Sequence, residues 1–302
     1  MDAPGLAYWS AAAADKAVID EDAYARMAAH PRFPEACTRS AHNSLKRLEG
    51  NSVTAKLAKD LSRIFYGIFV LYLDARDELT LTGIQEFCVE TGLASPGRAA
   101  AILLQLRMMG YVARDPSPSV TRRRRFLPAP VMKEGLRDVF RDELLAMALL
   151  EPEAHIAAER LHDPETFKQF VLFLGRGFAN VARRRTINPL TPFAARNAGF
   201  PILYHIATSG QADDPYPPKG AVRISIKEIA RRFEVSRSHV LRLLREVEGS
   251  GHLRRNPDET TGVLEEPLRE ALRYIHAGVF MGVASCIYRA MQAVNAKSDC
   301  NT

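Results

Sequence analysis

Four polar side chains lie close together in one stretch of the sequence: Arg237, Ser238, His239 and Arg242. Guanidinium and hydroxyl groups donate hydrogen bonds to phosphate oxygens, and guanidinium also matches the acceptor pair on the major-groove edge of guanine. Amphipathic surface helices more often carry Glu and Lys at such positions. The chemistry on offer is therefore hydrogen bonding to an anionic polymer, and a solvated basic helix is the alternative.

Two short helices joined by a tight turn must position these side chains. Apolar residues three and four positions apart predict the core face of each helix. In the first helix they are Ile226, Ile229, Ala230 and Phe233, and in the second Val240, Leu243, Leu244 and Val247. Ser236 supplies a hydroxyl suited to capping the second helix. The small Ala230 allows the two helices to approach closely near the turn.

This stretch resembles the helix-turn-helix of bacterial winged-helix regulators, and residues 251–255 look like the helix stop and first wing strand of that class. In such proteins the second helix enters the major groove of double-stranded DNA. The resemblance therefore implies DNA contacts from Ser236, Arg237, Ser238, His239 and Arg242.

The same plan occurs earlier in the chain. Phe87, Cys88, Gly92 and Leu93 precede Ile229, Ala230, Glu234 and Val235 by 142 positions each, whereas Gly110 precedes Gly251 by 141. Ahead of them, Gly67, Leu71 and Tyr72 precede Gly199, Leu203 and Tyr204 by 132. The proline-rich segment 211–220 accounts for the difference of ten residues and is expected to be a surface loop. Residues 79–82 are expected to form a short strand, and Gly92 a turn with positive φ.

The two repeats differ in where their charge lies. The first carries four consecutive arginines, Arg122, Arg123, Arg124 and Arg125, beside a proline and serine turn typical of a wing hairpin. Such a wing would contact the DNA backbone or minor groove, and a solvated charge run is the alternative. The first recognition helix offers only Ser95 and Arg98, with Gln105 and Arg107 as further candidates, as comparable donors. Because the second wing holds the acids Asp258, Glu259, Glu265 and Glu266, we expect the first repeat to grip DNA through its wing and the second to read it through its helix.

Long apolar segments at 44–62, 131–160, 164–185 and 267–296 flank and join the repeats. Together with the repeats, this arrangement resembles the MarR-type transcription regulators over residues 44–296. The resemblance implies a mainly α fold with small β-hairpin wings, in which two winged helix-turn-helix repeats are joined and flanked by long helices. One chain would then form a pseudo-dimer on an asymmetric operator, and a homodimer is the alternative. A small aromatic effector or an oxidant is a further implied partner, although Cys88 fits a small buried hydrophobe better than a redox switch.

Three segments are expected: an alanine-rich arm over residues 1–43 with a helix at about 15–29, a first repeat over 44–160, and a second over 161–302. Net charge is +6, as expected for a protein that meets phosphates. The cysteines, Cys37, Cys88, Cys286 and Cys300, lack metal-ligand spacing, so we expect no metal, no cofactor and a reducing cytoplasm. No signal peptide is recognised, and the apolar runs 64–73 and 278–288 are too short to span a membrane.

An enzyme is not expected, because the sequence has no phosphate-binding glycine loop and no nucleophile motif, and its histidines are scattered. A sequence-specific regulator of transcription is the favoured function. Two alternatives stay open. Plasmid replication initiators also resemble two winged helices in tandem, and some winged-helix proteins are scaffolds that bind other proteins. The arginines at 122–125 and 237–242 argue against a scaffold.

Overall fold

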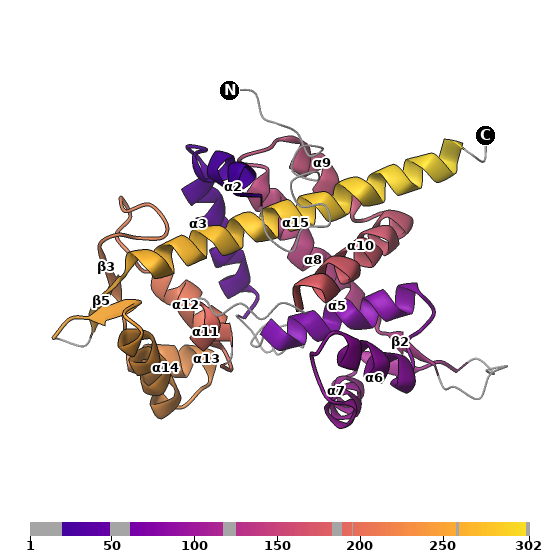
Figure 1. Ribbon diagram of the computed structural model, residues 1–302, viewed down its shortest axis with the longest axis horizontal. Coiled ribbons are helices and arrows are strands. Elements are labelled where there is room, and N and C mark those ends of the chain that lie inside the picture. Colours follow the sequence, from indigo (N-terminus) through magenta and orange to yellow (C-terminus); the bar gives the residue numbers. More distant parts are fainter. Residues whose placement is uncertain are drawn as a thin grey trace.

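A computed structural model describes residues 20–48, 61–116, 125–182, 189–194, 196–257 and 260–299. In this part the chain is mainly α-helical, with two small antiparallel sheets (Figure 1). The expected mainly α fold with small β-hairpins is therefore confirmed. The elements group into two units that repeat one order of helices and strands.

Unit 1 consists of α5 (Leu61–Ala75), α6 (Leu81–Glu90), α7 (Pro96–Met108), β1 (Val112–Arg114), β2 (Phe126–Pro128) and α8 (Pro130–Met147). Unit 2 consists of α12 (Gly199–Ala207), β3 (Ala221–Arg223), α13 (Ile226–Phe233), α14 (Arg237–Gly249), β4 (Leu253–Arg255), β5 (Thr261–Leu264) and α15 (Glu266–Asp299). Both units thus run from a helix through a helix pair and a hairpin to a closing helix, as the sequence offsets predict.

Hydroxyl caps set where the paired helices begin. Ser95 accepts the backbone N–H of Arg98 at the start of α7, and Ser236 accepts that of His239 at the start of α14. Each satisfies one of the amides that a helix leaves free at its first turn. Because these two caps lie 141 positions apart, they locate the missing residue of the second repeat between Val235 and Ser236.

The expected strand at residues 79–82 is wrong. Thr80 instead caps α6 by accepting the backbone N–H of Gly83 at 2.9 Å, and Leu81 begins that helix. Only one isolated bridge, between Thr80 and Arg125, lies where unit 2 has a full strand. Unit 2 pairs β3, β5 and β4 in a three-stranded sheet, whereas unit 1 pairs β1 with β2 alone. A capping hydroxyl competes with strand formation at such a position.

The turn between the paired helices uses the same backbone conformation in both units. Gly92 has φ +68°, as expected, and the equivalent Glu234 has φ +53°. Glycine adopts this left-handed region without penalty, while a residue with a Cβ is disfavoured there by about 1 kcal/mol. Both units therefore have the same turn geometry, although unit 2 has a glutamate in place of the glycine.

Helices outside the two units help to build the body of the molecule. α3 (Phe33–Lys46) packs on α12 of unit 2, and α10 (Pro164–Ala182) packs on α5 of unit 1. The closing helices α8 and α15 contact α3 and α10 respectively, and also each other. α9 (Glu153–Arg160) and α11 (Thr191–Ala194) complete the connection. The closing helix α15 crosses the body of the molecule (Figure 1).

One glycine permits the closest of these helix crossings. A Cβ at Gly175 of α10 would lie 2.4 Å from the ring of Tyr72 on α5. No side chain fits there, so α10 and α5 can approach only because residue 175 has none.

The N-terminal segment belongs to the body in its described part. α2 (Glu21–Ala28) begins at the cap Asp20, and its Tyr24 hydroxyl donates to Glu270 of α15. α3 buries Cys37 and Ala41 completely, so the expected boundary after residue 43 falls inside a packed helix. A helix was expected over residues 44–62. α3 instead ends at Lys46, and residues 49–60 of the expected helix lie outside the described chain.

The segment 211–220 is a loop, but it does not lie wholly on the surface as expected. Tyr216 is 6 % exposed, and its hydroxyl lies 3.1 Å from Nε2 of the buried His276 on α15. The rings of Tyr204 and His276 stack with centroids 5.5 Å apart. The aromatic side chain of Tyr216 thus fixes this loop, and with it the start of β3, to the helical body.

α15 is the one helix in the described chain with the length and mean hydropathy of a membrane span, contrary to the expectation from the run 278–288. Core helices of globular proteins meet the same criterion when they are mostly buried. Along α15 the side chains of Leu272, Phe280 and Ile287 are fully buried against the rest of the body.

Candidate nucleic-acid interface

The start of α14 presents the donors that the sequence singled out. Arg237, Ser238 and Arg242 are exposed, while Val240, Leu243 and Leu244 on the opposite side are fully buried. No ion pair in the part of the chain that the structure describes includes Arg237 or Arg242. Their guanidinium groups are therefore positioned on a rigid helix and available to an anionic partner.

The carboxylates of α14 are paired with arginines from outside the helix. Glu246 forms an ion pair with Arg196, and Glu248 accepts Arg255 at 2.7 Å. The hydrogen bond from Arg255 is the main cause that lowers the pKa of Glu248, and Arg245 contributes through its charge. Because Arg196 and Arg255 neutralise these acids, the exposed arginines of α14 are not compensated by its own glutamates.

His239 serves the fold in addition to any contact with a partner. Its Nε2 lies 3.0 Å from the backbone oxygen of Asn197, and a carbonyl can only accept, so Nε2 carries the proton. Ser236 likewise accepts the amide of His239 as a cap. These two residues, expected at the interface, thus fix α14 against the segment before α12.

Several further cations of unit 2 are exposed and were not among the expected contacts, Arg223, Arg232 and Arg254 among them, and three others extend the surface of α14. These three are Lys227 and Arg231 on α13 and Arg245 on α14. We call Lys227, Arg231, Arg237, Arg242 and Arg245 the basic surface of unit 2. The sequence could have indicated these three residues, Lys227, Arg231 and Arg245. In the alignment of the two repeats, each is a cation in unit 2 and an uncharged residue in unit 1, so the charge is particular to unit 2.

That alignment shows how different the same surface is in unit 1. Lys227 and Arg231 correspond to Gln85 and Val89, which precede them by 142 positions. Arg242 and Arg245 correspond to Ala101 and Leu104, which precede them by 141. Val89 is 56 % exposed and Leu104 54 %. Unit 1 therefore presents apolar side chains where unit 2 presents cations.

Within α7 the expected contacts are few. Ser95 is occupied as a helix cap, accepting the amide of Arg98 at 3.4 Å. The side chain of Arg98 is exposed at the start of the helix. The start of α7 therefore offers one exposed guanidinium group, that of Arg98, whereas α14 offers those of Arg237 and Arg242.

Arg125, which was expected to contact phosphate, forms ion pairs within the fold. Its guanidinium lies 2.8 Å from Asp77 and 3.6 Å from Asp74, and Asp74 also binds Lys133 at 3.1 Å. The acids at the end of α5 thus neutralise Arg125 and join it to the base of the hairpin. Arg122, Arg123 and Arg124 lie outside the described residues, so their role stays a prediction.

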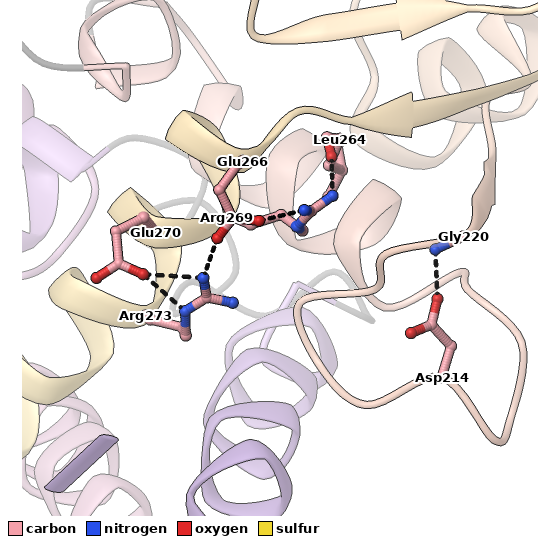
Figure 2. A network of polar contacts seen from close by, with 7 residues as sticks. All are labelled: Asp214, Gly220, Leu264, Glu266, Arg269, Glu270 and Arg273. Atoms are coloured by element: carbon pink, nitrogen blue, oxygen red, sulfur yellow. Dashed lines mark hydrogen bonds and ion pairs between the residues drawn. The ribbon is translucent and has the colours of Figure 1, made fainter. Parts of the chain in front are cut away.

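The second hairpin is fixed to the body by a network of charged groups (Figure 2). Arg269 donates to the backbone oxygen of Leu264 at 2.7 Å, and both Arg269 and Arg273 pair with Glu266. Arg254 on β4 pairs with Glu265 at 3.2 Å. The acids expected to repel phosphate at Glu265 and Glu266 are therefore neutralised; Asp258 and Glu259 lie outside the described chain.

A small apolar pocket of about 20 Å³ lies inside unit 1 between α5, α6 and α7. Aromatic and aliphatic side chains line it, among them Phe69, Phe87, Ile102 and Leu106. Cys88 also lines the pocket, and burial raises the pKa of its thiol. A thiol in this state is protonated and unreactive at neutral pH.

No group of His, Cys, Asp and Glu able to hold a metal occurs among the residues that the structure describes. His205 on α12 has its pKa lowered by burial and by the charge of Arg232, so it is neutral at pH 7. The side chains at this surface can bind an anion and offer no arrangement for covalent chemistry. Comparison of the chain with protein-family profiles, curated proteins and solved structures found no match, so the functional argument rests on the geometry of this surface.

Proposed function

We propose that the protein is a sequence-specific regulator of transcription that binds double-stranded DNA, built from two winged helix-turn-helix repeats. α14 of unit 2 enters the major groove, where Arg237 and Arg242 meet base edges and phosphates. The observation that supports this proposal is a pair of guanidinium groups on the outer side of a capped helix; they have no ion-pair partner among the described residues, and the acids of the helix are paired with other arginines.

The surrounding cations extend the proposed contact. Lys227 and Arg231 on α13 lie on the helix that crosses the backbone in a helix-turn-helix, where they suit phosphates. The three arginines 122–124 of unit 1 would add backbone or minor-groove contacts. Each phosphate neutralised steepens the dependence of affinity on salt by about 0.9 in a log–log plot.

Genome-wide mapping of bound sites tests the proposal, with wild type compared against Arg237→Ala/Arg242→Ala. A matched control is Arg160→Ala/Lys168→Ala, which removes two exposed cations of α9 and α10 from the body. We expect a recurrent sequence motif for wild type and control that the first variant loses. Diffuse binding that is the same in all three proteins would refute sequence-specific reading.

A replication initiator is the second candidate, because it would use the same two units. Its sites would be several direct repeats at an origin, which the same mapping distinguishes from scattered operators. The pocket lined by Phe69 and Ile102 has room for about one water molecule, so a small-molecule effector would have to be apolar and would have to widen it. We propose no cofactor, no catalytic activity and a cytoplasmic location on the chromosome.

A further inference from the structure

The outer side of unit 1 is an apolar stripe in a position where unit 2 is basic. Ala101, Leu104 and Met108 lie three and four residues apart on α7 and share one face of the helix. Met108 is 80 % exposed and Leu104 54 %, and Val89 on the adjoining α6 is 56 % exposed. We call Val89, Ala101, Leu104 and Met108 the apolar stripe of unit 1.

This stripe is poorly suited to the ligand that we propose for unit 2. Aliphatic side chains neutralise no phosphate, and they can read little of a base edge beyond the thymine methyl group. Glu86 and Glu90 are exposed on α6 beside the stripe. Their charges would repel a DNA backbone. The corresponding residue of Glu90 in unit 2, 142 positions later, is Arg232.

We propose that the apolar stripe is the contact surface between two copies of this chain. The pairing itself does not depend on the proposed DNA binding; only its consequence for the symmetry of the bound DNA site does. A two-fold axis across α7 pairs the same surface with itself, so each apolar residue meets an apolar residue. Along the 13 residues of α7 this gives a helix-to-helix seam about 20 Å long.

The charges around the stripe favour a second copy over an acidic or basic partner. The stripe is bordered by acids on α6, Glu86 and Glu90, and by the cation Arg98 at the start of α7. Two such surfaces in antiparallel contact place groups of both signs around an apolar centre, as protein interfaces commonly do. Elsewhere the chain is basic, with a net charge of +6, and pairing through its cationic surfaces would bring like charges together.

Pairing through unit 1 leaves both basic surfaces free. Each chain then supplies one reading helix, and the complex has two-fold symmetry. The bound DNA site would be an inverted repeat. This differs from the asymmetric site expected if both units of one chain read DNA.

Sedimentation equilibrium of the full-length chain over about 1–100 µM tests the pairing. We expect a concentration-dependent mass that reaches two chains. Leu104→Arg, which places at residue 104 the side chain that unit 2 carries at residue 245, weakens self-association by at least about tenfold, since it buries like charges at the axis. Ile156→Arg is the control, because Ile156 is 60 % exposed on α9 and lies outside the stripe; it leaves the association unchanged.

Disulfide trapping gives a second readout that does not depend on how well the arginine variant folds. A chain that carries both Met108→Cys and Val89→Cys is expected to form a disulfide-linked dimer under mild oxidation. A chain with Ile156→Cys is not. A wild-type chain that stays monomeric to 100 µM, or a dimer equally stable with Leu104→Arg, overturns the inference. Capture of a different protein by a monomeric chain overturns it as well.

The two proposals fail in different ways. Arg237→Ala/Arg242→Ala is expected to dimerise normally and lose specific DNA binding. A dimer that binds no specific DNA would refute the proposed function and leave the pairing in place. A monomer that recognises a specific site would refute the pairing alone.

Discussion

Leu104 of α7 and Arg245 of α14 occupy equivalent positions, each nine residues after the serine that caps its helix. Both side chains are exposed, and the residues that precede them, Leu103 and Leu244, are both buried. The two helices therefore have the same register against their cores and opposite chemistry on their outer sides. One fold repeated within a single chain can thus present two different kinds of surface.

Arg242→Ala/Arg245→Leu gives unit 2 the residues that unit 1 has at these positions. We expect its log–log slope of DNA affinity against salt to be less steep by about 2, because two phosphate contacts are lost. Fluorescence anisotropy with a bound site at several salt concentrations measures the slope. The control Arg160→Ala/Lys168→Ala should keep the wild-type slope, and a similar change in both variants would argue for general charge attraction.

Arg125→Ala is expected to affect stability and to leave DNA binding unchanged. The substitution leaves Asp77 without the guanidinium that lies 2.8 Å from it, and the pair is partly exposed, so the loss is about 1 kcal/mol. Urea unfolding measures it. Arg122→Ala/Arg123→Ala/Arg124→Ala should instead weaken DNA binding. A fall in DNA affinity for Arg125→Ala with unchanged stability would contradict this assignment.

The stability of the protein is expected to fall as the pH drops from about 6.5 toward 3. Burial lowers the pKa of His276 to about 3, whereas the unfolded side chain titrates near its ordinary value of 6.5. Between these values the unfolded state binds the extra proton, so acid favours unfolding. At pH 5 this amounts to about 2 kcal/mol relative to pH 7.

Denaturant unfolding at pH 7 and pH 5 measures the effect, with His276→Gln as the comparison, which should lose less stability over this interval. Tyr216→Phe removes the hydroxyl that contacts His276 and should cost about 1–2 kcal/mol at both pH values. Equal pH dependence for wild type and His276→Gln would show that other groups cause the acid sensitivity.

Glu143→Gln is expected to stabilise the protein at neutral pH. Burial raises the pKa of Glu143, against smaller opposing effects of the Ser40 hydroxyl and Arg47. A buried carboxylate with a raised pKa destabilises the fold as the pH rises through that pKa, and an amide has no such penalty. Glutamine can keep the hydrogen bond that Ser40 donates at 2.7 Å.

Thermal unfolding of wild type and Glu143→Gln at pH 4 and pH 8 checks this prediction. The melting temperatures should differ most at pH 8, with the variant higher. Glu151→Gln is a useful comparison, since Glu151 is also a buried glutamate. A variant that is less stable than wild type at pH 8 would mean that the carboxylate is favourably paired.

Much of the local structure followed from the sequence. The apolar periodicity of α13 and α14, the cap Ser236 and the left-handed turn at Gly92 depend on neighbours within a few residues, and each is as expected. The prediction of a strand at residues 79–82 was wrong, because alternating apolar residues and threonines suit a strand and a capped helix start equally well. The difference depends on whether a partner strand is available, as β5 is for β3.

The amino-acid sequence was sufficient to predict a mainly α fold with small hairpins, the helices α13 and α14, and the position of Arg237 and Arg242 on the outer side of α14. These follow from periodicity and capping, which act over one or two helical turns. Three features depend on long-range packing: Arg125 is neutralised by Asp74 and Asp77, Tyr216 anchors its loop at His276, and α3 and α10 pack on α12 and α5. Such contacts join residues far apart in the chain, and long-range packing and charge pairing leave no signature in local spacing.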